Sequence, residues 1–551
     1  MTSQCRTVFC CGAAFLLLLG CAFVLKPGAV WITDNGNKYI MIRNFAKGEG
    51  TVIKHVFPEL FPTGGFHFIK VPGGAVSFYP EYLSFITVPF YKLFGERGTL
   101  FFPLLATLLL LFMAWHFWHI PPPLLLLSTP LFFYSLLLWE MTPSVCLCLG
   151  ALLLAEKRRF LLSGTLLGIS LIMREEAYFL GGAMGAALLC CGKWQEALKF
   201  GAGFLGAALP LWGFQWSVHG HFLGNHGKYY YLNNNAGFSL FTQLKAFFFN
   251  CYHHLFRFDG WANSHFNYLV WSALLPLAAG AAPAFKKWLT FKYTALIIYL
   301  GAMCLLIPGV WFQSNTIYAA SCLTGLLTAT PLTAGFLVNW NGFLHCRRFK
   351  LPALGAILYI VGVPPLMTAS DVGLVWGARH FLIILPLLFW LSFRGFRLMG
   401  IPKFKGCFKA KQLLPCGAVL LSVTIQLYGI FALFRVSGES HAIEQRLLGA
   451  SEKIIVTDVF YLPEQMPRLF FEKDVVQVIS KEDITLLRQF LKEHKAARFT
   501  LLLSPRFRRM DDAVLKELLT LFPLLSQPER LCGKGGFPDL FRGTCAVPAS
   551  K

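Results

Sequence analysis

The stretch TLFFPLLATLLLLFMAWHFWH, at residues 99–119, contains no Asp, Glu, Lys or Arg. About 20 mostly apolar residues are enough for a helix to cross the hydrocarbon core of a bilayer, so this stretch predicts a membrane-spanning helix. Further apolar runs lie at 8–25, 121–139, 142–155, 160–173, 177–192, 200–218, 267–285, 292–312, 316–338, 351–368, 378–393 and 413–434. Since two of them are short for a span, the pattern predicts a polytopic α-helical membrane protein with about 11–13 transmembrane helices.

The composition agrees with this fold class. Of the 551 residues, 56% are hydrophobic, 16% aromatic and 14% charged, whereas soluble domains carry about 25% charged residues. In a soluble protein the formal net charge of +22 would indicate a nucleic-acid partner. Here the basic residues lie mostly in short loops between apolar runs, where they determine topology. Membrane lipids are therefore the expected partners of this charge, and nucleic acid is not.

The basic residues are distributed unequally between alternate loops. With the N-terminus in the cytoplasm, nearly all Lys and Arg of the short loops fall on the inner side, and Arg174 and Arg379 fall on the outer side. By the positive-inside rule, the outer loops at 27–98 and 219–266 and the tail from residue 436 are extracytoplasmic. The sequence thus predicts a transmembrane module at 1–435 and an extracytoplasmic domain at 436–551.

The tail differs in composition from the rest of the chain. Residues 453–458, 475–479 and 498–504 predict strands, whereas 481–494 and 511–522 predict helices. Ser480 and Asp483 have the spacing of a capping box, which marks the start of the first of these helices. The alternation of strands and helices predicts a small α/β domain, which either recognises an acceptor or has a structural role.

Acidic side chains gather at the predicted outer ends of the spans. They are Asp34, Glu81, Glu140, Glu175, Glu176, Asp259 and Asp371. Ionisable groups within the spans would favour a transporter. Carboxylates at one membrane face instead suit an enzyme acting on a lipid-anchored substrate, where they accept a proton or bind a divalent cation.

Asp34 opens the first polar segment, TDNGNKYIMIRNFAKGEG at residues 33–50. The segment from Lys38 to Lys47 predicts a short amphipathic helix along the membrane surface. Lys38 follows Asp34 by one helical turn and could form an ion pair with it. The spacing alone fits equally well an N-cap at Asp34 and a lysine that reaches the lipid headgroups.

Four stretches follow one another along residues 30–395: Thr33–Gly48, Tyr79–Gly95, Gly164–Glu176 and Trp376–Pro386. They contain, in turn, an acid before a helix, a Pro-Glu-Tyr approach to a span, a glycine-rich span followed by Arg and acids, and a Gly-x-Arg before an apolar span. In this order they resemble the polyprenol-phosphate-sugar-dependent glycosyltransferases of the GT-C fold. The likeness is greatest to the branch of protein O-mannosyltransferases and aminoarabinose transferases.

The resemblance implies catalytic roles for two acids. Asp34 corresponds to the acid of the family's first outer loop, which makes it the expected catalytic base or acceptor-orienting carboxylate. Glu140 corresponds to a second acid and is expected to complete the site, although a loop acid at the interface would look the same. Asn35 stands where many relatives have a second adjacent acid, so this loop lacks one carboxylate of a two-carboxylate metal site. A divalent cation is therefore an optional cofactor.

The resemblance and the isolated outer cations also indicate substrate-binding residues. They are Lys38, Arg43, Glu81, Lys228, Arg379 and His380. An arginine such as Arg379 suits bidentate binding of a phosphate, although it could instead pair with Asp371 or a lipid phosphate. Arg174 is expected to pair with Glu175 between tightly packed spans.

These features predict a glycosyltransferase that moves a sugar from a polyprenyl-phosphate carrier to a lipid, glycan or protein acceptor. The resemblance implies the bacterial inner membrane, where relatives with a soluble outer tail and no retention signal are found. A flippase or transporter of lipid-linked glycans is the alternative, and it predicts an internal repeat and charged groups along a central cavity. A non-catalytic scaffold has no need of acids gathered at one membrane face.

Overall fold

The computed structural model describes residues 3–26, 33–61, 67–225, 250–251, 255, 289–313, 325–364, 376–398, 410–459, 462–504, 510–531 and 540–548. The chain divides into two compact units. Unit 1 contains Met1–Ala22, Pro103–Phe222 and Asn234–Ala432, and unit 2 contains Phe23–Phe102, Leu223–Asn233 and Leu433–Lys551. The division groups the first predicted outer loop with the tail.

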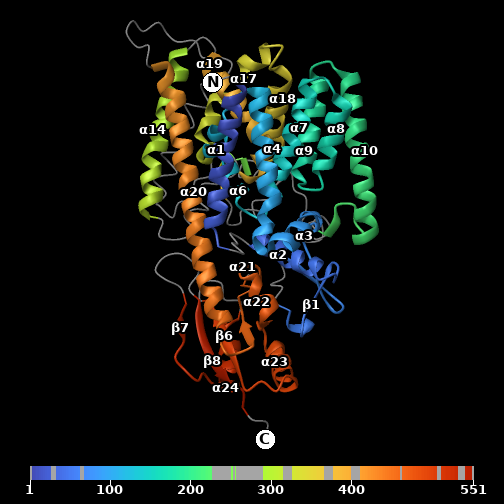
Figure 1. Ribbon diagram of the computed structural model, residues 1–551, viewed down its shortest axis with the longest axis vertical. Coiled ribbons are helices and arrows are strands. Elements are labelled where there is room, and N and C mark those ends of the chain that lie inside the picture. Colours follow the sequence, from blue (N-terminus) through green and yellow to red (C-terminus); the bar gives the residue numbers. More distant parts are fainter. Residues whose placement is uncertain are drawn as a thin grey trace. The chain divides into compact units, whose positions relative to one another are not determined.

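Unit 1 is helical throughout its described part (Figure 1). Its helices are α1 (Ser3–Val24), α4 (Phe101–Trp118), α5 (Pro122–Leu127), α6 (Leu131–Ser135), α7 (Met141–Glu156), α8 (Phe160–Ser170), α9 (Glu176–Cys190), α10 (Trp194–His219), α14 (Leu289–Gln313), α16 (Leu326–Ala329), η4 (Pro331–Thr333), α17 (Ala334–His345), α18 (Lys350–Gly362), η6 (Arg379–Ile384) and α19 (Leu385–Leu398). The long helix α20 (Ala410–Leu448) begins in unit 1 and ends in unit 2.

Several helices have the length and composition of membrane spans. In the described part of the chain, four helical stretches qualify, namely Tyr82–Trp118, Trp194–His219, Arg379–Arg397 and Leu413–Leu448. Shorter apolar helices lie at Phe9–Val24, Met141–Glu156, Phe160–Ser170, Glu176–Cys190, Thr294–Leu305 and Lys350–Gly362. Large apolar side chains such as Phe112, Leu209 and Leu420 are exposed on these helices. Lipid contact explains this exposure, and the helices fit a polytopic helical membrane protein.

The prediction of one spanning helix at 121–139 was wrong. This run forms two short helices, α5 and α6, and most of its side chains are buried inside unit 1. Pro130 lies between them, and a proline has no backbone N–H to continue the helical hydrogen-bond pattern. The apolar character of the run therefore reflects burial within protein. The predicted span at 267–285 lies outside the described residues.

Helices α8 and α10 pack with their backbones in close contact. A Cβ atom at Gly164 would overlap the carbonyl oxygen of Phe200, and one at Gly203 would overlap that of Leu161. Gly164 and Gly168 are four residues apart and lie on one face of α8, an arrangement that lets membrane helices approach closely. The glycine-rich run noted in the sequence is thus a helix-packing surface.

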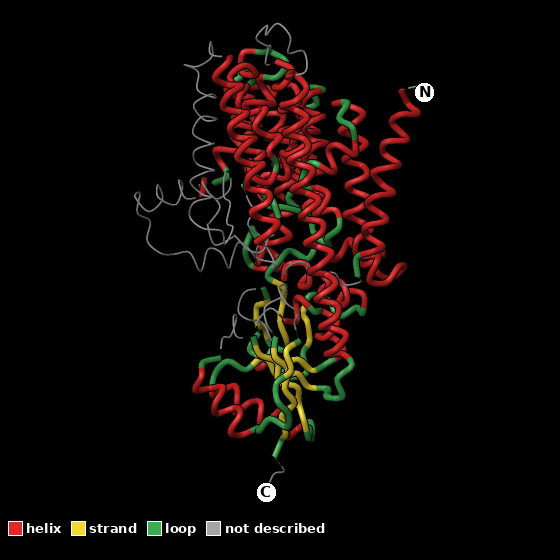
Figure 2. Tube along the Cα trace, turned by 90° about the vertical axis from the view of Figure 1, so that its left-hand side faces the viewer, coloured by secondary structure: helices red, strands yellow, loops and turns green. Residues whose placement is uncertain are grey.

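Unit 2 contains two β-sheets, drawn in yellow in Figure 2. Its strands are β1 (Val52–Lys54), β2 (Phe68–Val71), β3 (Gly74–Ser77), β4 (Ile454–Thr457), β5 (Asp474–Gln477), β6 (Arg498–Leu503), β7 (Glu529–Arg530) and β8 (Phe541–Ala546). Its helices are α2 (Thr33–Ala46), η1 (Pro58–Leu60), α3 (Tyr82–Phe94), η2 (Gly95–Leu100), α21 (Leu462–Gln465), α22 (Pro467–Glu472), α23 (Lys481–Glu493) and α24 (Asp512–Leu521).

The larger sheet is formed by the tail. Its strand order is β5-β4-β6-β8-β7, with β4 parallel to β5 and β6, and β8 antiparallel to β6 and β7. The capping box is confirmed, because the Ser480 side chain accepts from the Asp483 backbone N–H and the Asp483 side chain accepts from that of Ser480. The predicted strands correspond to β4, β5 and β6, whereas β7, β8, α21 and α22 were not foreseen.

The first loop packs against the tail within unit 2. The small sheet has the order β1-β3-β2 with antiparallel pairing. Phe57 and Leu60 of the first loop join the buried core of the larger sheet, beside residues such as Phe490. In the other direction, Phe470 of α22 joins the core formed by α2 and the small sheet, where its ring lies 5.6 Å from that of Phe61. The two halves of unit 2 thus share their apolar cores.

The expectation of an amphipathic surface helix after Asp34 was wrong. Helix α2 includes Asp34 in its first turn, and ten of its residues, from Asp34 to Asn44, are buried. It packs against α3, α21 and α22. A Cβ atom at Gly36 would overlap the backbone carbonyl of Glu464 in α21. Gly36 is therefore required by close approach of two backbones.

Gly36→Ala should destabilise unit 2, because a methyl group cannot enter the space between α2 and α21 without moving one backbone. The expected loss is about 1–3 kcal/mol, visible as a lower melting temperature of the detergent-solubilised protein. Gly438→Ala is the matched control, since Gly438 lies in α20 within the same unit with no atom within 4 Å of the added Cβ. Equal melting temperatures for the two variants would contradict the close contact.

Candidate functional site

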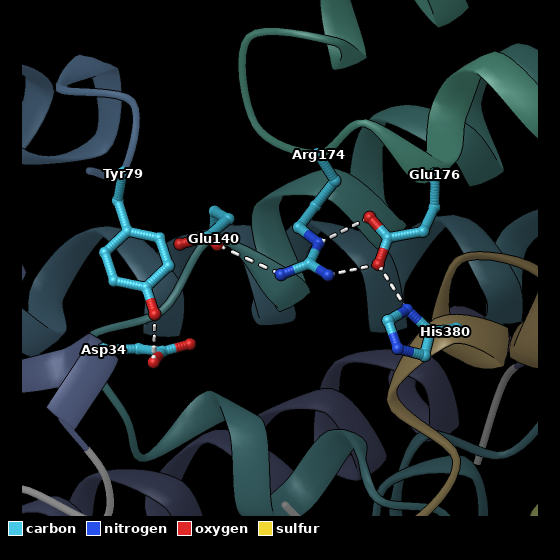
Figure 3. Close-up of polar contacts among 6 residues, drawn as sticks. All are labelled: Asp34, Tyr79, Glu140, Arg174, Glu176 and His380. Atoms are coloured by element: carbon cyan, nitrogen blue, oxygen red, sulfur yellow. Dashed lines mark hydrogen bonds and ion pairs between the residues drawn. The ribbon is translucent and has the colours of Figure 1, made fainter. Parts of the chain in front are cut away.

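Asp34 lies in unit 2 as a buried carboxylate, with 7% of its surface exposed. The Tyr79 hydroxyl donates a hydrogen bond of 2.6 Å to Oδ1 of Asp34 (Figure 3). Tyr79 follows β3, and Asp34 lies inside the first turn of α2 and not at a capping position before it. A carboxylate oriented in this way can accept a proton from an approaching hydroxyl or amine.

Two cations of α2 contact aromatic rings within unit 2. Lys38 is 2% exposed, and its Nζ lies 4.5 Å from the centroid of the Tyr79 ring. Burial of this lysine within the protein excludes the role of reaching lipid headgroups. Arg43 lies in the last turn of α2, with Cζ 4.2 Å from the centroid of the Phe471 ring. Such cation–π contacts orient the two side chains.

Of the substrate-binding candidates Glu81 and Lys228, the structure describes Glu81 alone. Glu81 occupies the N-cap position of α3, directly after the Tyr79-Pro80 pair, and is partly exposed. Lys228 lies outside the described residues, as do Asp259 and Asp371. The alternative pairing of Arg379 with Asp371 is therefore untested.

A second acid from the tail lies near Asp34 within unit 2. Glu464 of α21 is 2% exposed, and its Oε2 lies 2.8 Å from Nδ1 of His67. The Asn37 side chain donates to the backbone carbonyl of His67 at 2.9 Å and lies 3.5 Å from Oε1 of Glu464. No sequence signal indicated this cluster, because Asn37 and Glu464 are separated by more than 400 residues.

The His67–Glu464 pair has shifted protonation equilibria. Burial alone lowers the pKa of His67, but the Glu464 carboxylate outweighs burial and raises the pKa of His67 above its ordinary value. Burial raises the pKa of Glu464, and His67 and Asn37 oppose that shift. Asp34 raises both pKa values, since its negative charge favours protonation of its neighbours.

Unit 1 contains a separate cluster of buried charges. Arg174 lies between α8 and α9, and its guanidinium binds both carboxylate oxygens of Glu176, with Nε 2.8 Å from Oε2 (Figure 3). Its Nη1 donates to Oε1 of Glu140 at 3.1 Å. Oε1 of Glu176 also lies 2.8 Å from Nδ1 of His380. The partners of Arg174 are thus Glu176 and Glu140, and the pairing expected with Glu175 was wrong.

The positions of Glu175 and Glu176 at the start of α9 explain why Arg174 pairs with Glu176. Glu176 is the first residue of α9, whereas Glu175 occupies the N-cap position before it. The carboxylate of Glu176 is 4% exposed and receives three contacts, two from Arg174 and one from His380. A bidentate pair of this kind is stronger and more directional than a single contact.

The turn at residues 376–380 is fixed by hydrogen bonds at both ends. The Tyr134 hydroxyl donates to the Trp376 carbonyl at 2.7 Å, and the Tyr359 hydroxyl donates to the His380 carbonyl at 2.6 Å. Gly377 has φ of +67°, and a Cβ there would lie 2.6 Å from Cγ of Pro130. The turn places Cζ of Arg379 at 5.9 Å from the centroid of the Trp139 ring.

Among the described residues, no group of three or more His, Cys, Asp or Glu side chains has a metal-binding arrangement. Asp34 belongs to unit 2 and Glu140 to unit 1, and each contacts residues of its own unit. Glu140 contacts Arg174, a role that the sequence did not indicate.

Comparison with known proteins gives structural neighbours of full length. The structure of ArnT from Cupriavidus metallidurans bound to undecaprenyl phosphate is 14% identical, with a TM-score of 0.45, over 100% of this chain and 99% of that chain. The apo structure of the same protein is 14% identical, with a TM-score of 0.44, over 97% of each chain. With TM-scores below 0.5, these similarities assign no activity. No family model and no curated protein matches the sequence.

Glu176→Gln should destabilise unit 1 more than Glu140→Gln. Loss of the Glu176 charge leaves the buried Arg174 guanidinium without its bidentate partner, at a cost of about 3–5 kcal/mol. Glu140→Gln removes the charge from one 3.1 Å contact and leaves the Glu176 pair in place. Thermal unfolding of the purified variants measures the difference, and equal losses would contradict the assigned contacts.

Proposed function

We propose that this protein is an integral membrane glycosyltransferase that acts on the extracytoplasmic face of the bacterial inner membrane. It transfers a sugar from a polyprenyl-phosphate carrier to a hydroxyl or amine of a lipid, glycan or protein. The proposal is supported by the order of the four family-like stretches along the chain. The single observation that carries it is the buried Asp34 carboxylate of the first stretch, which accepts a hydrogen bond from the hydroxyl of Tyr79 in the second stretch.

In the proposed reaction Asp34 accepts the proton of the acceptor group as that group attacks the anomeric carbon of the donor sugar. The new bond joins the acceptor atom to this carbon, and the bond from the carbon to the phosphate oxygen breaks. The leaving polyprenyl phosphate takes the electron pair of the broken bond. General-base assistance of this kind contributes about 10²–10⁴ in rate.

The developing charge on the phosphate requires cations. We assign phosphate binding to Arg379, because a guanidinium can donate two parallel hydrogen bonds to one phosphate. Lys38, Arg43 and Lys228 are further substrate-binding candidates, together with Glu81 and His380. Glu140 accepts a hydrogen bond from Arg174. We propose that Glu140 also takes a direct part in catalysis. If a divalent cation binds, it would neutralise charge on the phosphate, and none of the bond changes in the proposed reaction depends on it.

A flippase of lipid-linked glycans is the second candidate. The observation in its favour is the buried cluster of Arg174, Glu140, Glu176 and His380 in unit 1, since buried ionisable groups in membrane proteins often mark transport pathways. The two candidates differ in chemistry. A transferase cleaves the bond between sugar and carrier, whereas a flippase leaves the lipid-linked sugar intact.

Asp34→Asn should lower sugar transfer by about 10²–10⁴ without loss of expression, because the amide keeps the size of the side chain but cannot accept the proton. The substrate is lipid-linked sugar extracted from a strain that lacks the gene, and release of polyprenyl phosphate measures transfer in membranes that contain the acceptor. Glu49→Gln is the matched control, since Glu49 is an exposed acid just after α2. Near-normal transfer by folded Asp34→Asn protein would remove Asp34 from the chemistry.

Arg379→Lys should weaken donor binding, because lysine retains the charge but lacks the planar fork. The expected change is a rise of about tenfold in the KM for the lipid-linked sugar, which corresponds to roughly 1.4 kcal/mol. Arg435→Lys, at a partly buried arginine that pairs with Glu439 in unit 2, is the comparison. An unchanged KM for Arg379→Lys would place Arg379 outside the donor site.

A further inference from the structure

Tyr79, which donates to Asp34, is held in place by three neighbours within unit 2. The Ser77 hydroxyl accepts from the Tyr79 backbone N–H at 3.0 Å. The ring of His67 stacks on the Tyr79 ring, with centroids 5.6 Å apart and an interplanar angle of 23°. Nζ of Lys38 lies 4.5 Å from the centroid of the Tyr79 ring. The position of the Tyr79 hydroxyl is thus determined by its surroundings.

Glu464 orders these neighbours. Its carboxylate binds Nδ1 of His67 at 2.8 Å, which orients the ring that stacks on Tyr79. Asn37 lies against Glu464 and accepts from the Ser77 hydroxyl at 2.6 Å. Since Glu464 comes from the tail, a residue of the tail is linked to the Asp34 carboxylate through two intervening side chains.

We propose that Glu464 and His67 are positioning residues that hold Tyr79, and through it the Asp34 carboxylate, in the orientation required for proton transfer. This inference rests on the proposed function of Asp34. It gives the tail a part in the reaction beyond acceptor recognition or structural support. Neither Glu464 nor His67 needs to touch the substrate, because each acts through Tyr79.

The contacts predict a pH dependence with a definite sign. The pKa of His67 is raised above its ordinary value of about 6.5. The charged His67–Glu464 pair therefore exists between the raised pKa of Glu464 and the raised pKa of His67, and it is lost as pH rises through the folded-state pKa of His67. Among the described residues, the other charged groups that act on His67 are Asp34, which favours the protonated histidine, and Lys38, which opposes it. Loss of the pair should loosen Tyr79 on the alkaline side.

The test compares transfer rates of the full-length protein and its variants across pH 5–9, with lipid-linked sugar extracted from a strain that lacks the gene. Glu464→Gln and His67→Asn should each lower kcat by about tenfold or more with little change in KM, as misplaced groups do. His67→Asn keeps a donor near Nδ1 but cannot titrate, so the alkaline decrease assigned to His67 should disappear. A merely structural role would lower the rate equally at every pH.

A double-variant cycle tests whether Glu464 acts through Tyr79. The rate of Tyr79→Phe/Glu464→Gln should match that of Tyr79→Phe alone, because the hydroxyl that Glu464 helps to place is already absent. Glu472→Gln is the matched control. Glu472 is a more exposed acid in α22 that pairs with Arg468, and its substitution should leave kcat and the pH profile unchanged.

The outcomes separate this inference from the proposed function. Normal kcat and pH profile in Glu464→Gln and His67→Asn, with Asp34→Asn inactive, would overturn the positioning role and leave Asp34 as the base. Multiplicative losses in the double variant would also overturn it. Full transfer by Asp34→Asn would instead refute the proposed function of Asp34, on which the inference depends.

Discussion

The close approach of Gly36 in α2 to the backbone of Glu464 in α21 is the contact on which unit 2 depends. Here the first loop lies so close to the tail that any side chain at position 36 would overlap the Glu464 backbone. The same approach brings Asn37, one residue further along α2, against the Glu464 side chain. The shared apolar cores around Phe57 and Phe470 then extend the contact on both sides. Because Gly36 has no side chain, α2 and α21 can approach closely and Asn37 can reach the Glu464 side chain.

Unit 1, in contrast, buries charged side chains among apolar helices. Arg174 and Glu176 satisfy one another through a bidentate pair, and Glu140 and His380 occupy the remaining positions around them. Buried charges that are paired and hydrogen-bonded are tolerated, whereas removal of one partner leaves an uncompensated charge. The cluster connects the start of α9 to the turn that carries Arg379. It therefore fixes the residue next to the proposed phosphate ligand.

Local signals in the sequence predicted a large part of the fold. The capping box at Ser480 and the alternation of β4, α23 and β6 follow from residue spacing, as do the apolar helices α4, α10 and α20. The run at 121–139 was misread as one span, because hydropathy cannot distinguish burial in protein from burial in lipid. The sequence also predicted a surface position for helix α2, because its polar residues resemble a solvated face, although they are buried against the first loop and the tail.

The candidate site was predictable only in part. Asp34 and Arg379 stand out in family-like stretches, but the partner of Arg174 depends on whether Glu175 or Glu176 turns inward at the start of α9. Contacts between distant segments, such as His67 with Glu464, leave no trace in spacing or periodicity. These long-range contacts are set by tertiary packing, and they supply the geometry around Asp34.

Polyprenyl-linked sugars in cells from which the gene has been deleted report directly on whether the protein transfers sugar from the carrier. In these cells a polyprenyl-phosphate-linked sugar should accumulate in the extracytoplasmic leaflet, because its transfer to the acceptor is blocked. Mass spectrometry of lipid extracts, combined with labelling by a membrane-impermeant reagent, measures both the amount and the leaflet. An unchanged lipid-linked sugar pool, or accumulation confined to the cytoplasmic leaflet, would contradict a glycosyltransferase at this face of the membrane.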